Sequence, residues 1–96
     1  MTGYMHDWTL LSVKVDWIKG EAAIDFRALS GHISVHAVGL SEVHIPRHFP
    51  WGRSESVNSV KGPSLAENSE AHLSIEMQSG DVIRISARSF VMPEQP

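Results

Sequence analysis

Apolar and polar residues alternate with a period of two along much of this chain, as they do in strands with one face in a core and the other in water. One run covers 11–17, a second covers 21–28 and a third covers 32–38. Gly20 and Gly31 fall between the runs, where turns need a residue that tolerates positive φ. The pattern predicts an antiparallel meander of three strands. The apolar face of its first strand consists of Leu11, Val13, Val15 and Trp17.

A second well-marked region covers 71–88. Apolar residues alternate with polar ones on both sides of the turn 78–81, whose Gly80 suits a left-handed turn position. This region predicts a hairpin. Its apolar face consists of Leu73, Ile75, Met77, Ile83, Ile85 and Ala87.

The segment between these regions is irregular. Residues 43–45 predict a brief strand that Pro46 ends, because proline cannot donate to a ladder. Residues 56–61 predict another strand with a bulge, since Val57 and Val60 break the alternation. Small and polar residues make 62–70 the expected flexible loop, and the end of the chain, 93–96, is expected to be frayed.

Helical periodicity is not sustained in any window, so the expected fold is all-β. A length of 96 residues with 42% hydrophobic residues suits one domain with a modest core. We therefore expect a single all-β domain over 1–96, either a small antiparallel β-sandwich or a curved meander of six or seven strands. Trp8 and Trp17 are expected in its core or at the rim.

Charge and composition exclude several classes of function. The net charge is −3 and lysine and arginine form no run, which argues against a nucleic-acid partner. The absence of cysteine rules out disulfides, thiolate chemistry and cysteine-ligated metals, and it favours a reducing compartment. The first residues do not resemble a signal peptide, and no apolar stretch approaches the ~20 residues of a membrane span. The expected location is the cytoplasm, with no membrane partner.

Catalytic and metal sites find little support in the spacing of polar residues. Six histidines are present, but His32 and His36 would lie about 13 Å apart along a strand, too far to hold one ion together. No GxSxG, phosphate-binding glycine loop or HExxH motif occurs. We expect no catalytic residue, cofactor or metal, although a histidine-based metal protein or hydrolase assembled from distant residues stays an alternative.

The segment 45–53 has the most distinctive composition, with two prolines, two aromatic residues, two arginines and a histidine. Prolines reduce the entropy lost on binding, and tryptophan and arginine are favoured in interface hot spots. We interpret the segment as a candidate protein-binding loop, with the Phe49–Pro50 bond either cis or trans. The alternative is that Phe49 and Trp51 close one end of the fold. The candidate contact residues are Arg47, His48, Trp51 and Arg53.

Four short stretches carry a resemblance to a group of proteins: 6–8, 16–17, 50–58 with its Pro-Trp-Gly, and 76–83 with its Gln-Ser-Gly-Asp. With these stretches the chain resembles short, uncharacterised bacterial all-β proteins, and in style it is similar to the immunity proteins of bacterial toxin systems. The resemblance implies an acidic binding protein rather than a catalyst.

The expected function is a non-enzymatic protein-binding or interaction domain. The first alternative is an immunity-type inhibitor of a bacterial toxin, which would bind tightly and in a salt-sensitive way. A homodimer is also expected to be accessible through an exposed strand edge such as 43–45.

Overall fold

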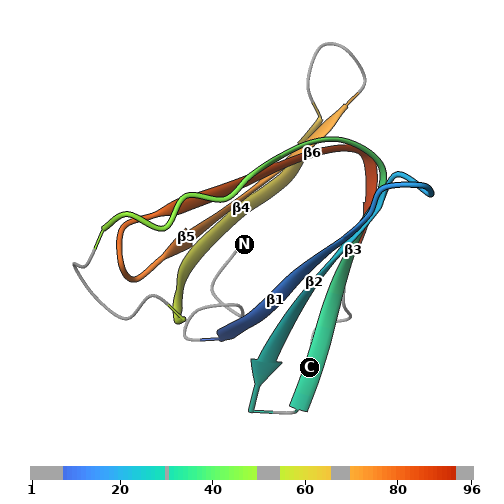
Figure 1. Ribbon diagram of the computed structural model, residues 1–96. Coiled ribbons are helices and arrows are strands. Elements are labelled where there is room, and N and C mark those ends of the chain that lie inside the picture. Colours follow the sequence, from blue (N-terminus) through green and yellow to red (C-terminus); the bar gives the residue numbers. More distant parts are fainter. Residues whose placement is uncertain (1–7, 30, 50–54, 66–69, 93–96) are drawn as a thin grey trace.

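The computed structural model describes residues 8–29, 31–49, 55–65 and 70–92, and in this part of the chain it is all-β, as predicted. The strands form one open antiparallel sheet in the order β1-β2-β3-β6-β5-β4 (Figure 1). They are β1 (Thr9–Asp16), β2 (Glu21–Ala28), β3 (Gly31–His44), β4 (Val57–Leu65), β5 (Ala71–Met77) and β6 (Val82–Val91).

The sheet consists of two three-stranded meanders joined side by side. The predicted meander of the first three strands is confirmed, with Ile24 opposite Val35 in β2 and β3. The predicted second hairpin is confirmed as well, with Ile75 of β5 opposite Ile83 of β6. β3 and β6 then pair with each other and connect the two halves.

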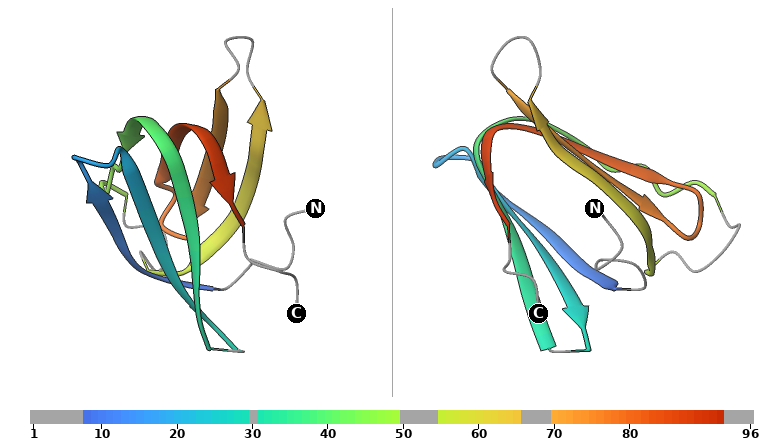
Figure 2. Two further views of the ribbon diagram at one scale, coloured as in Figure 1. Left: turned by 90° about the vertical axis from the view of Figure 1, so that its right-hand side faces the viewer. Right: turned by 180° about the vertical axis from the view of Figure 1, so that it is seen from behind.

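β3 is longer than predicted, because the expected brief strand 43–45 is the end of the same strand. Gly39 has a φ of 70°, and the pairing with β6 shifts register between Leu40 and Glu42. The glycine therefore bends the strand without ending it, and Val43 still pairs with Ile85. Figure 2 shows the result, a sheet folded over where β3 and β6 bend, so that β1 and β2 face β4 and β5.

The core lies between the facing halves of the folded sheet. Phe26 and Ile24 of β2 are fully buried in it, and the ring of Trp8 packs on Phe26 with a centroid separation of 5.6 Å. Alternate residues of β5 and β6 supply the opposite wall, as the sequence indicated. The other buried apolar residues are Ala22, Val35, Ala37, Val57, Val60, Ala71, Leu73, Ile75, Met77, Ile83, Ile85 and Ala87.

A bulge in β1 corrects the predicted apolar face of that strand. The pairing with β2 shifts register between Leu10 and Ser12. Side chains before the bulge therefore point to the opposite face of the sheet from the one that alternation predicts. Leu10 and Val13 consequently pack against the core, while Leu11 is about half exposed. Trp17 stands in the turn after β1 and is 88% exposed, so it belongs to the surface rather than to the core.

β4 also departs from its predicted bounds. It continues through the cis Gly62–Pro63 bond to Leu65, into residues assigned from the sequence to a 62–70 loop. Its predicted irregularity is confirmed by register shifts between Val57 and Ser59 and between Lys61 and Ser64. The tail 93–96 lies outside the described residues.

The outermost strands, β1 and β4, meet at one end of the sheet. Thr9 and Ser56 form an antiparallel bridge. On either side of it the Leu10 N–H donates to the Glu55 carbonyl at 2.7 Å, and the Val57 N–H donates to the Trp8 carbonyl at 2.8 Å. The sheet is therefore partly closed at this end.

Candidate functional site

The predicted binding segment follows β3 along the side of the molecule, and residues 45–49 of it are described. Arg47 and His48 are exposed, and Ile45 and Phe49 are about half exposed. Phe49 is therefore not among the buried core residues. Trp51, Arg53 and the Phe49–Pro50 bond lie wholly or partly outside the described residues.

Asp81, in the turn between β5 and β6, holds this segment in place. Its carboxylate accepts the N–H of His48 at 2.8 Å and the N–H of Phe49 at 3.2 Å. The Ser79 hydroxyl donates to the same carboxylate at 2.9 Å. Asp81 is only 2% exposed, so a buried charge satisfied by backbone donors fixes residues 48 and 49 against the turn.

The hydrogen bonds keep Asp81 ionised despite its surroundings. Burial is the largest influence on its pKa and acts to raise it, because a charge is poorly solvated there. The donors from His48, Ser79 and Phe49 outweigh that effect, and the pKa of Asp81 lies below its ordinary value. The Asp81 carboxylate that binds residues 48 and 49 is thus charged at neutral pH.

A groove of about 440 Å³ lies beside the held segment. Ile45, Pro46 and Arg47 form one wall, and residues 10–13 of β1 form the other. Met77, Ser79, Asp81, Ile83 and Glu55 complete the lining. The lining thus combines seven apolar residues with five polar or charged ones, Ser12, Arg47, Glu55, Ser79 and Asp81.

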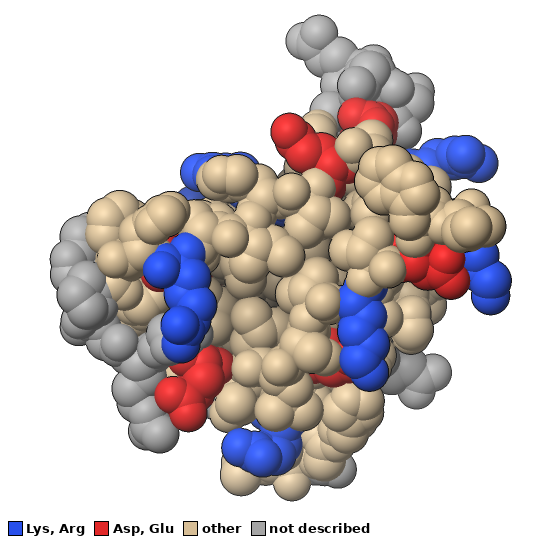
Figure 3. Space-filling model, viewed as in Figure 1, with Lys and Arg blue, Asp and Glu red and all other residues tan. Residues whose placement is uncertain are grey.

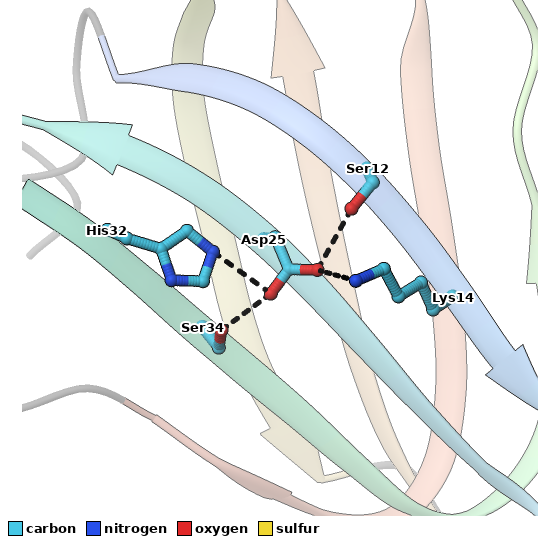
Figure 4. A network of polar contacts seen from close by, with 5 residues as sticks. All are labelled: Ser12, Lys14, Asp25, His32 and Ser34. Atoms are coloured by element: carbon cyan, nitrogen blue, oxygen red, sulfur yellow. Dashed lines mark hydrogen bonds and ion pairs between the residues drawn. The ribbon is translucent and has the colours of Figure 1, made fainter.

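A second buried carboxylate, Asp25 on β2, belongs to the outer face of the first meander (Figure 4). It accepts the Ser34 hydroxyl at 2.6 Å and the Ser12 hydroxyl at 2.9 Å, from the strands on either side. Lys14 Nζ and His32 Nε2 lie 3.7 Å and 3.4 Å from its oxygens. Through its side-chain hydrogen bonds, Asp25 therefore links β2 to both neighbouring strands, β1 and β3.

This cluster contains serine, histidine and aspartate without the geometry of a catalytic triad. In a triad the histidine stands between the acid and the serine, so that it can take the hydroxyl proton. Here Ser34 and His32 both contact Asp25 directly. The hydrogen bonds from Ser34 and then Ser12 lower the pKa of Asp25, burial opposes them, and Lys14 and His32 add to the lowering. The arrangement stabilises the ionised carboxylate and the sheet.

The histidines are spread over several strands. His32 and His36 lie on the outer side of β3, and His72 of β5 is bonded through Nδ1 to the Ser86 hydroxyl at 2.7 Å. Within the described ranges, no three His, Asp or Glu side chains are placed to hold a metal ion together.

Sequence reasoning located the segment 45–49 but missed both buried carboxylates. Asp25 falls on the wet face of an alternating strand, and only its neighbours across the strands reveal its burial. Asp81 directly follows the turn glycine, so the sequence alone indicates an ordinary turn residue there. Its partners, residues 48 and 49, are more than 30 positions away in the chain.

No protein-family model, curated protein or solved structure matches the chain. In the part of the chain that the structure describes, no helix has the length and apolar character needed to cross a membrane.

Proposed function

We propose that this chain is a non-enzymatic protein-binding domain, and that its contact surface is formed by residues 45–49 together with the groove beside them. The observation that carries the proposal is the set of hydrogen bonds that holds residues 48 and 49 to Asp81. The Asp81 carboxylate binds their backbone N–H groups and so orders an exposed, largely irregular segment before any partner arrives. Such preorganisation reduces the entropy lost on binding.

The exposed side chains of this surface are of the kinds that anchor interfaces. Ile45 and Phe49 offer half-exposed apolar area, and Leu11 continues that area across the groove. Arg47 adds a cation of the type enriched in hot spots. Lysines and arginines are interspersed with acidic residues over the face seen in Figure 3, which favours recognition by shape and apolar contact over long-range steering.

Site-specific photo-cross-linking in cells tests the proposal. A photoreactive residue at position 45 or 49 is expected to capture the same protein, whereas one at Leu29, which is fully exposed in the turn after β2, is expected not to capture it. If the captured protein is a toxin, the domain has the narrower function of an immunity-type inhibitor. Capture of the same proteins from all three positions, or of none, would contradict the proposal.

The captured protein then allows a quantitative test. Ile45→Asp and Arg47→Ala are each expected to weaken its binding by about tenfold or more, the size of a hot-spot effect. Arg27→Ala is the matched control, because Arg27 is an exposed arginine on the outer face of β2, away from the groove. Equal affinities for all three variants would remove the 45–49 surface from the proposal.

A further inference from the structure

Among the described residues, the second edge of β1 has no strand partner beyond Leu10. The strand pairs with β2 on one side, and on the other it meets β4 at Thr9 and Leu10. Beyond that point the edge borders a second groove of about 380 Å³, lined by Val15, Trp17, Gly20 and residues 40–43. A strand edge of this kind presents unpaired N–H and C=O groups that another strand can bind.

Exposed apolar side chains gather along this edge and its turn. Leu11 and Val15 are each 47% exposed, and Trp17 and Ile18 are almost fully exposed. They are half of the large apolar side chains that stand exposed among the described residues. An edge that carries so much apolar surface is suited to being covered by another chain.

The charges of β1 favour a second copy of this chain as the partner. Lys14 and Asp16 lie two residues apart on the outer face, with Val15 between them. If a second copy pairs antiparallel about Val15, Lys14 faces Asp16 of the partner subunit, and the same pair forms again by symmetry. Directly opposite residues have Cβ atoms about 4.5–5.5 Å apart, within reach of an ion pair.

The neighbouring symmetric register is disfavoured by the same residues. Pairing about Lys14 would place this lysine opposite its own copy, and like charges directly opposite each other are destabilising. Pairing about Val15 also sets Val13 opposite Trp17 of the partner subunit and Val15 opposite Val15 of the partner subunit. The edge is thus complementary to itself, as a twofold interface requires.

We propose that the chain dimerises through the edge of β1, with two copies paired antiparallel about Val15. The partner contact is placed on 13–17, on a different edge from residues 43–45, where the sequence suggested it. The dimer proposal does not rest on the proposed protein-binding function, because Ile45, Arg47 and Phe49 take no part in the pairing. The two contacts share Val13, which also lines the groove beside residues 45–47.

Analytical ultracentrifugation of the full chain over a wide range of concentrations tests the dimer. The sedimentation coefficient is expected to rise with concentration for the natural sequence. Lys14→Asp and Asp16→Lys each put like charges opposite each other, so each is expected to weaken association by about tenfold. The double variant Lys14→Asp with Asp16→Lys restores both opposite-charge pairs and is expected to restore the dimer.

Lys61→Asp is the matched control, because Lys61 is an exposed lysine on β4, the outer strand on the other side of the sheet. It is expected to leave association unchanged, and circular dichroism confirms that each variant is folded. A natural chain that stays monomeric at every concentration would overturn the proposal. So would a folded double variant that does not regain the dimer, or a Lys61→Asp variant that loses it.

Discussion

Thr9 of β1 and Ser56, directly before β4, form an antiparallel bridge that brings the two outermost strands of the sheet together. The bridge has a consequence for the core, because Trp8 precedes Thr9 and its carbonyl accepts the N–H of Val57. Trp8 is thereby held with its ring on Phe26 and with 7% of its surface exposed. The contacts that join β1 to β4 therefore also hold this tryptophan in the core.

Replacement of the two tryptophans beside β1 is expected to have very different effects. Trp8→Ala removes a buried aromatic ring and should lower the free energy of unfolding by about 3–5 kcal/mol. Trp17→Ala removes an exposed ring from the turn and should change it by less than about 0.5 kcal/mol. Urea unfolding followed by circular dichroism at low protein concentration measures both. Similar losses for the two variants would show that Trp8 does not close the core.

Gly39 is expected to be the glycine that the bend of the sheet needs. Its φ of 70° is left-handed, and a Cβ placed there would lie 2.8 Å from Cβ of Arg88 on β6. Gly39→Ala should therefore lose about 1–2 kcal/mol for the backbone conformation, and about 1–3 kcal/mol more for the overpacking.

Gly20→Ala provides the control for this bend. Gly20 also has a left-handed φ, of 66°, but a Cβ there would meet nothing within 4 Å. The variant should lose only the backbone contribution of about 1–2 kcal/mol. Urea unfolding compares the two variants directly, and an equal loss would mean that contact with Arg88 does not limit the bend.

Periodicity predicted the strands where alternation is strict and failed where the chain departs from it. The first three strands and the last two follow from alternation, because each buries one face and wets the other. The bulge at Leu11 shifts the phase by one residue, and alternation before and after a bulge looks continuous in the sequence. The bend at Gly39 similarly looked like the end of a strand, although pairing with β6 carries β3 on to His44.

The candidate site was predictable in part, since composition drew attention to 45–53. What the sequence could not supply was the partner of that segment. Asp81 holds residues 48 and 49 only because β6 returns beside β3, and such long-range pairing leaves no local signal. The same holds for Asp25, whose donors Ser12 and Ser34 come from two other strands.

Asp81→Asn is expected to loosen the segment 45–49 without unfolding the sheet. The amide keeps one carbonyl oxygen but removes the charge that two backbone N–H groups and the Ser79 hydroxyl share. Amide hydrogen exchange at His48 and Phe49 should accelerate by on the order of tenfold, while exchange in β2 stays unchanged. Asp16→Asn is the control, because the Asp16 side chain is exposed and its carboxylate accepts the local turn N–H of Lys19. Unchanged exchange at both residues in Asp81→Asn would argue that Asp81 does not hold residues 48 and 49 in place.

Asp25 is expected to make the stability of the first meander dependent on pH in the acid range. Hydrogen bonds from Ser34 and Ser12 lower its pKa in the folded chain, so folding favours the ionised form. The resulting stability is fully present above the pKa of the unfolded chain, about 3.9, and is lost as the pH falls through the lower folded value.

The measurement that checks this linkage compares Asp25→Asn and Ser34→Ala with the natural chain by urea unfolding from neutral pH down to pH values below 4. Asp25→Asn cannot titrate, so its stability should fall less steeply with acid than that of the natural chain. Ser34→Ala should lose about 1 kcal/mol at neutral pH, because it removes the shortest hydrogen bond to the carboxylate, and it should fall less steeply than the natural chain as well. Arg27→Ala leaves the cluster intact and should retain the natural slope. An Asp25→Asn variant as acid-sensitive as the natural chain would place the linkage elsewhere, with Asp81 the next carboxylate to replace.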